Sequence, residues 1–240
     1  MSEVFGGGIK PFLLWRNVFT RDTITPGAEN TVDENTVDFW EGDELSASVS
    51  GEIVNAVGIQ GHDLAGAAIT VEADGAVIGT YTPEYDGLVL IVHDPIAVNT
   101  SYDVSFSRSG RVTNIMAGRG IEFPHGIDSG GFDLIQYSTR SELIQNNTLN
   151  GNYLGNRVVR QGLEIDIPLN FLDQDTMESV RDFIPHYNEG HMFFFATSPE
   201  LLPNDAGLFW RPESGGDMRV NAFETFGFYD ISISASGVDR

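Results

Sequence analysis

The chain has no cysteine and a single lysine, Lys10, among its 240 residues. Without thiols it has neither disulfides nor thiolate metal sites. Its 13 basic residues stand against 35 acidic ones, for a formal net charge of −22. A surface of that sign repels phosphate backbones, so we expect no sequence-specific nucleic-acid binding.

Long apolar runs are also missing. No stretch is long enough to cross a bilayer as a helix, so we expect no membrane insertion. The N-terminal MSEVFGGGIKPF lacks the basic start and apolar centre of a signal peptide, which predicts synthesis in a cytoplasm. Residues 1–11, with three consecutive glycines, are expected to form a flexible arm.

Complete catalytic motifs are absent too. There is no Gly-x-Ser-x-Gly, and Gly118-Arg119-Gly120 lacks the third glycine of a dinucleotide fingerprint. We therefore expect a chain that is not an enzyme and that uses no cofactor. The sequence assigns no ligand-binding residues.

What the sequence does contain is a pattern of short strands. Glycine is abundant, with 27 residues, and turn pairs separate short alternating apolar runs. Leu45, Ala47 and Val49 alternate with serines, and Asp74-Gly75 and Asp86-Gly87 provide turns. Later, Tyr102, Val104 and Phe106 alternate in the same way. This spacing predicts a mainly β chain that begins with a β-sandwich over residues 12–113.

The second half, residues 114–240, carries the clearest pattern. Leu163, Ile165, Ile167 and Leu169 alternate with polar positions, which predicts a half-buried strand, and Pro168 indicates a sheet edge. Asp175 and Glu178 resemble a capping box, so a helix is expected near 176–184 that ends at Pro185. The run 191–197 (HMFFFAT) predicts a strand covered on both faces. A final strand is expected over 226–235.

The polar stretch 132–158 is compatible with an extended hairpin or with a long loop. Loops of that length inside compact folds are usually functional or make subunit contacts.

Several residue groups have side chains of the types found in chemical sites. His186, Glu189 and His191 have the residue types of a metal site, but they straddle a helix end instead of lying on one helical face, so packed or surface histidines are expected. Asp173 and Asp175 are expected to cap a helix and not to bind calcium. His62-Asp63 is expected to form a turn and not part of a hydrolase triad.

Tryptophan offers another kind of site. Trp15, Trp40 and Trp210 are each a core residue or a sugar-stacking platform.

Two ordered sets of residues carry a family resemblance. Asp38-Phe-Trp40 and Ala56-Val-Gly-Ile-Gln-Gly-His-Asp-Leu64 resemble the discoidin-like, galactose-binding-like jelly roll of many phage virion proteins. The second half resembles the tail-tube-like domain of siphophage distal tail and baseplate proteins. The matching residues there are Ser141, Gly151, Leu154-Gly155, Phe193-Phe-Phe195, Pro199 and Trp210-Arg-Pro212.

The resemblance implies a structural subunit of a phage tail tip or baseplate, made in the host bacterial cytoplasm and located in the virion tail. Such subunits form a homo-oligomeric ring, most often a hexamer, around the DNA channel, and they dock tail-tube, baseplate or fibre proteins. The acidity is that expected of a solvated surface, and it also suits the wall of a channel through which DNA passes without binding. Because discoidin-like loops often bind glycans, a glycan-binding host-adhesion module is the alternative, with the Asp63 and Asp86-Gly87 turns as candidate contacts. A glycoside hydrolase is a third hypothesis.

Overall fold

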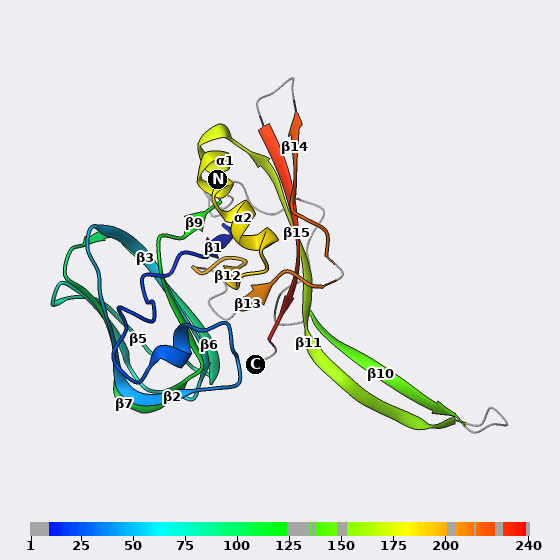
Figure 1. Ribbon diagram of the computed structural model, residues 1–240, viewed down its shortest axis with the longest axis horizontal. Helices are drawn as coiled ribbons and strands as arrows, with labels where there is room; N and C mark the ends of the chain where they lie inside the picture. Colours follow the sequence, from blue (N-terminus) through cyan, green and yellow to red (C-terminus); the bar gives the residue numbers. More distant parts are fainter. Residues whose placement is uncertain are drawn as a thin grey trace, which may run out of the picture.

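The computed structural model describes residues 10–123, 135, 138–147, 153–200, 205–213, 215–223 and 228–238. In this part of the chain the strands form three sheets, of eight, four and three strands (Figure 1). The prediction of a mainly β chain is confirmed. None of the described helices is both long and apolar enough to cross a membrane.

The first part folds into a β-sandwich. Its four-stranded sheet has the order β2-β7-β4-β5, and its three-stranded sheet has the order β6-β3-β8. The core between the two sheets buries the predicted alternating residues of β2 and β7. The elements are η1 (Glu29–Val32), β2 (Trp40–Ser48), β3 (Glu52–His62), β4 (Ile69–Ala73), β5 (Ala76–Tyr81), β6 (Gly87–Val98), β7 (Ser101–Val112) and β8 (Asn114–Gly118).

The large sheet has the order β10-β11-β15-β13-β12-β1-β9, and β14 pairs with β15. Two helices, α1 (Gln174–Arg181) and α2 (Phe183–Asn188), pack on one of its faces. Its strands are β1 (Phe12–Leu14), β9 (Ile121–Glu122), β10 (Thr139–Asn147), β11 (Tyr153–Leu172), β12 (Phe193–Ala196), β13 (Ala206–Trp210), β14 (Arg219–Phe223) and β15 (Phe228–Gly237).

Strand β12 contributes side chains to the packing on both faces of the large sheet. All four of its residues are buried, as the aromatic run predicts. Because successive side chains of a strand point to opposite faces, Phe193 and Phe195 join the core under the helices, whereas Phe194 joins a separate cluster that faces the sandwich. The outer face of the three-stranded sheet supplies the other half of that cluster, including Ala56 and Leu90. The large sheet is therefore covered by helices on one face and by the sandwich on the other.

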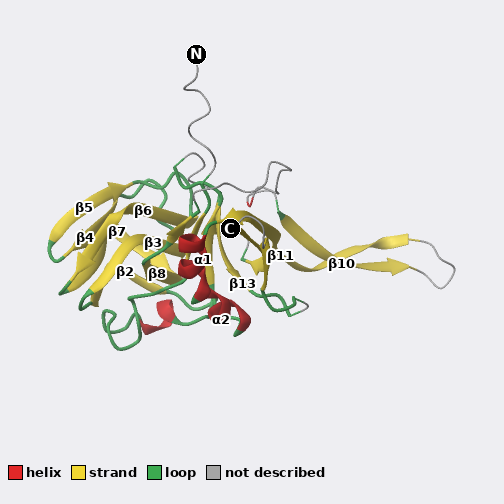
Figure 2. Ribbon diagram, turned by 90° about the horizontal axis from the view of Figure 1, so that it is seen from above, coloured by secondary structure: helices red, strands yellow, loops and turns green. Residues whose placement is uncertain are grey.

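The hairpin formed by β10 and β11 projects away from the rest of the molecule, on the side of the large sheet opposite the sandwich (Figures 1 and 2). Strand β10 pairs with β11 from Thr139 to Asn147, whereas β15 pairs with β11 only from Leu163 onward. The hairpin alternative for 132–158 therefore holds for the described residues of that stretch. At about 3.3 Å per residue, β10 extends roughly 30 Å.

The strand expected at 163–169 is the inner half of β11. Leu163, Ile165, Ile167 and Leu169 are buried, whereas Glu164 and Asp166 are exposed, so the predicted alternation is confirmed. Pairing with β10 ends at Leu163, and Pro168 pairs only with β15 in the described chain, which places it at the expected edge.

The helix differs from the prediction at both ends. Its N-cap is Asp173, whose carboxylate accepts a hydrogen bond from the Thr176 amide at 2.8 Å, and Asp175 lies in the first turn. Pro185 does not end the helical segment. The first helix ends at Arg181, and Asp182 is the N-cap of α2. Pro185 lies in the first turn of α2, where a backbone N–H would have no acceptor within the helix.

Two strands do not follow the expected division of the chain at residue 113. Strand β1 pairs with β12 of the large sheet although it precedes the sandwich, and β8 pairs with β3 of the sandwich although it follows residue 113. The domain boundaries themselves stay a prediction. Of the expected N-terminal arm, residues 1–9 lie outside the described residues, as does Gly151 of the resemblance.

Candidate functional site

One end of the sandwich brings together the two turns singled out in the sequence. The turn after β3, which contains Asp63, lies beside the turn before β6, which contains Asp86. The Ala65 amide donates to the Asp86 carboxylate at 2.8 Å, and the Gly66 amide donates to the Pro83 carbonyl at 2.8 Å. The two turns thus form one surface, which we call the loop end.

Strand β7 holds the Asp63 turn in place from the other side. The Arg111 amide donates to the Asp63 carboxylate at 2.7 Å, and the Arg108 guanidinium donates to the Asp63 carbonyl. Gly110 permits this close approach, because a Cβ at that position would lie 2.2 Å from the Leu64 side chain. The turn is therefore fixed by backbone and carboxylate contacts before any ligand binds.

Two aromatic rings are exposed at or beside the loop end. Tyr85 precedes Asp86 and is 58 % exposed, and Phe39 precedes β2 and is 48 % exposed. The Arg111 guanidinium lies 4.9 Å from the centre of the Phe39 ring, which is a cation–π distance. An exposed aromatic ring can stack on a sugar ring. The guanidinium and carboxylate groups beside it can form hydrogen bonds with the hydroxyls of that sugar. The sequence analysis named Phe39 only within Asp38-Phe-Trp40 and predicted neither ring to be exposed, because exposure depends on the tertiary fold.

His62 lies beneath the loop end and is 3 % exposed. Its Nδ1 accepts a hydrogen bond from the Leu64 amide at 3.2 Å, so the expected turn is present. Burial lowers the pKa of His62, although the nearby Asp86 and Asp63 carboxylates oppose this shift. His62 is consequently a neutral packing residue at pH 7.

The histidines near α2 form a contact between the sandwich and the large sheet. His191 Nδ1 lies 2.7 Å from Glu34, and its Nε2 lies 3.3 Å from Glu189. His186 Nε2 contacts the Met192 carbonyl at 2.8 Å, and burial lowers the pKa of His186. Among the described residues, no group of three His, Asp or Glu side chains is arranged to hold a metal ion.

All three tryptophans are partly buried. Trp40 is half-buried and covers Gly42, where an added Cβ would lie 2.2 Å from its ring. Trp15 packs on Phe183 and His186, with ring centroids 6.1 and 5.3 Å away. Trp210 lies half-buried in β13.

No family model matches the chain, and no curated protein matches it. Among solved structures, chitosan-binding module 1 of a chitosanase/glucanase from Paenibacillus sp. IK-5 is 14% identical, with a TM-score of 0.35, and the match covers 43% of this chain and 99% of that one.

Two further matches are to AlyQ. The CBM32 module of AlyQ in complex with 4,5-unsaturated mannuronic acid is 17% identical, with a TM-score of 0.31, over 40% of this chain and 92% of that one. Truncated AlyQ, with CBM32 and alginate lyase domains, is 13% identical, with a TM-score of 0.34, over 86% of this chain and 55% of that one. None of these reported structures is a virion protein. These reported structures each contain a carbohydrate-binding module, in one case together with an alginate lyase domain.

Proposed function

We propose that this chain is a structural subunit of a bacteriophage tail tip or baseplate, which assembles into a homo-oligomeric ring around the DNA channel and docks other tail proteins. The observation that supports it is the projecting hairpin of β10 and β11. An isolated two-stranded hairpin is marginally stable in water, and its free strand edges invite pairing with another chain. Contact with a neighbouring subunit would stabilise the hairpin and pair its free strand edges. By resemblance, we propose a hexamer in the virion tail, without catalytic activity.

Shortening the hairpin tests this proposal. Replacing residues 143–159 by Asn-Gly joins the paired positions Glu142 and Arg160 through a two-residue turn. We expect a folded monomer, because β11 keeps its pairing with β15, while the wild-type chain forms rings. Light scattering gives the mass of the particles that each chain forms, and negative-stain images show whether these particles are rings. Rings of unchanged mass from the shortened chain would contradict the role of the hairpin, and Val77→Ala, on the exposed face of β5, is the control.

A glycan-binding host-adhesion module is the second candidate, and the exposed rings at the loop end favour it. In this case Tyr85→Ala should weaken binding to a glycan array by roughly twofold to twelvefold, because aromatic stacking contributes about 0.5–1.5 kcal/mol. Thermal stability should not change, since Tyr85 is 58 % exposed. Val77→Ala should bind like the wild type. If the wild-type chain binds no glycan, this candidate is excluded and the ring proposal is unaffected.

A further inference from the structure

A small cavity lies where the sandwich meets the large sheet, and we call it the junction cavity. Its volume is about 130 Å³. Trp15, which follows β1, contributes to its wall together with Phe194 and Leu208 of the large sheet. The sandwich contributes Thr31 and Asn114. Because a cavity needs roughly 10–15 Å³ to hold one water molecule, the junction cavity has room for several.

Asn114 contributes a buried acceptor to this wall. The residue is 6 % exposed, and its Oδ1 is buried without a hydrogen-bond partner among the described residues. Its Nδ2 donates to the Asp33 carbonyl at 2.8 Å and to the Asn35 carbonyl at 3.3 Å. Carbonyl oxygens only accept hydrogen bonds, so the amide nitrogen of Asn114 has to face them. These two contacts therefore fix the orientation of the amide group and leave its oxygen unpaired.

Trp15 contributes a buried donor. Its Nε1 is shielded from solvent and forms no hydrogen bond within the part of the chain that the structure describes. The ring packs on Phe183 and His186, with centroids 6.1 and 5.3 Å away, and the Arg16 guanidinium lies 4.8 Å from its centre. These contacts hold the ring in place without using its N–H. Because an indole N–H only donates, its partner has to supply a lone pair.

The uncharged polar side chains elsewhere in the wall already have partners. Asn17 Oδ1 accepts from the Phe19 and Ala117 amides, each at 3.0 Å. The Thr31 hydroxyl donates to the Ala28 carbonyl at 2.7 Å, and its oxygen keeps a lone pair for a further hydrogen bond.

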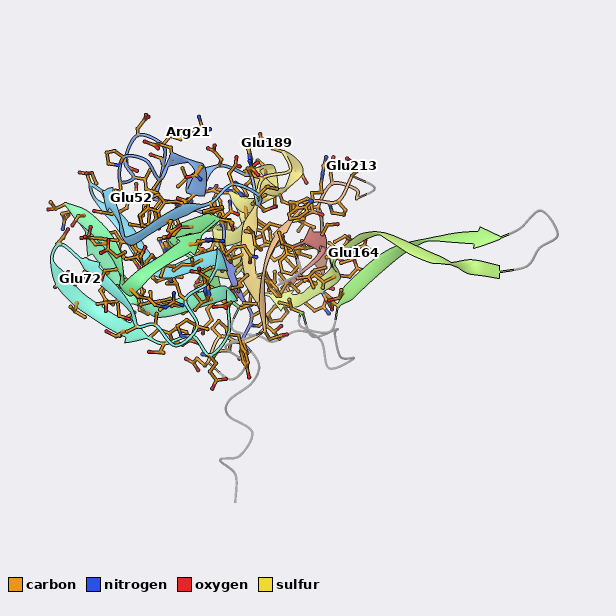
Figure 3. All side chains as sticks on the ribbon, turned by 90° about the horizontal axis from the view of Figure 1, so that it is seen from below. Arg21, Glu52, Glu72, Glu164, Glu189 and Glu213 are labelled. Atoms are coloured by element: carbon orange, nitrogen blue, oxygen red, sulfur yellow. The ribbon has the colours of Figure 1, made fainter. Side chains whose placement is uncertain are left out.

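The two carboxylates of the wall are paired as well. Asp33 accepts from Arg21 Nε at 2.7 Å, and Glu34 lies 2.7 Å from His191 Nδ1. Figure 3 shows Arg21 on the sandwich and Glu189, which also contacts His191, at the end of α2. Among the described residues, the buried side-chain atoms of the wall that remain unpaired are thus one donor and one acceptor.

We infer that the junction cavity binds hydroxyl groups, from ordered water or from a small polyol, that accept a hydrogen bond from Trp15 and donate one to Asn114. Buried polar groups of folded proteins are nearly always hydrogen-bonded, to protein or to bound water. A hydroxyl provides a donor and an acceptor on one atom, whereas an ammonium group only donates and a carboxylate only accepts. The Asp33 and Glu34 carboxylates also disfavour an anion in this cavity.

The bound hydroxyls connect the two layers of the molecule. Trp15 follows β1 of the large sheet, and Asn114 begins β8 of the sandwich. Hydrogen bonds through water are nearly as favourable in enthalpy as direct ones, so they add a polar link beside the apolar contact of Phe194 with Gly58. This inference goes beyond the proposed ring and does not depend on it.

A high-resolution crystal structure of the full chain, grown without polyol, tests the inference. We expect ordered density within about 3.2 Å of both Trp15 Nε1 and Asn114 Oδ1. A second crystal, soaked in glycerol, distinguishes the two sources. Glycerol in place of the water peaks would show that the cavity accepts a polyol, and unchanged peaks would show that ordered water supplies the hydroxyls. If either atom has no density within that distance, or bonds to another residue instead, the inference is wrong.

Asn114→Leu tests the acceptor, because leucine has a similar size and no polar atom. Its crystal structure should lose the density beside position 114 and keep the density beside Trp15 Nε1. Asn99→Leu is the matched control at an exposed position outside the cavity, and it should keep both peaks. Unchanged density beside Leu at position 114 would contradict the inference. If the Asn114→Leu chain does not fold, the two wild-type crystals still decide the question.

Discussion

Phe194→Asp is expected to separate the large sheet from the sandwich and to unfold much of the chain under native conditions. Phe194 is fully buried and lies between Leu14 and Leu208 on the neighbouring strands. Its ring lies over Gly58 of β3, on the outer face of the sandwich. An unpaired carboxylate buried there costs several kcal/mol, against a total stability of about 5–15 kcal/mol for a typical protein.

Urea denaturation and limited proteolysis measure this effect. The variant should lose the cooperative wild-type transition, and the segments between β9 and β12 should become accessible to protease. Val77→Asp is the matched control, because Val77 is 63 % exposed and the same substitution should change the free energy of unfolding by less than about 0.5 kcal/mol. A Phe194→Asp chain that melts cooperatively at the wild-type midpoint would show that this ring is not buried between the sheets.

Gly58→Val is expected to disrupt the same contact from the opposite side. A Cβ at position 58 would lie 2.8 Å from three atoms of the Phe194 ring, so the two sheets must move apart or the ring must leave its position. Overpacking of this kind costs about 1–3 kcal/mol or more. The measured quantity is the midpoint of urea denaturation, which should fall clearly below that of the wild type.

Gly79→Val is the control for this change, because nothing lies within 4 Å of a Cβ at position 79 of β5. Valine favours strands, so that variant should be as stable as wild type or slightly more stable. Adding Phe194→Ala to Gly58→Val should cost less than the sum of the single changes, because the valine then occupies the space that the ring leaves. Strictly additive costs would mean that the two residues do not share a contact.

Patterns that depend on near neighbours were predictable from the sequence. The alternation at 163–169 and at Tyr102, Val104 and Phe106 follows from the two-residue period of a strand, and both sets are buried as predicted. The Asp74-Gly75 turn is another example, since both residues take positive φ angles of 50° and 78° that glycine and aspartate tolerate. The helix boundary was less predictable, because Asp173 and Asp175 are both plausible caps, and only the folded backbone selects Asp173.

The candidate site was only half predictable. The Asp63 and Asp86 turns are visible in the sequence, but their hydrogen-bonded contact joins residues 21 positions apart. The exposure of Tyr85 and the cation–π contact between Phe39 and Arg111 carry no local signal.

The sequence by itself determined the β class, the acidic surface, the absence of thiol chemistry and the strands with a buried face, because each depends on composition or on neighbouring residues. The tertiary structure decided which strands pair and which faces meet. It placed β1 beside β12, turned Phe194 toward the sandwich and directed the β10–β11 hairpin outward. The physical reason is that strand pairing and sheet packing depend on contacts between residues far apart in the sequence. The alternating pattern of one strand shows which of its faces is buried, but it does not show which strand or sheet lies against that face.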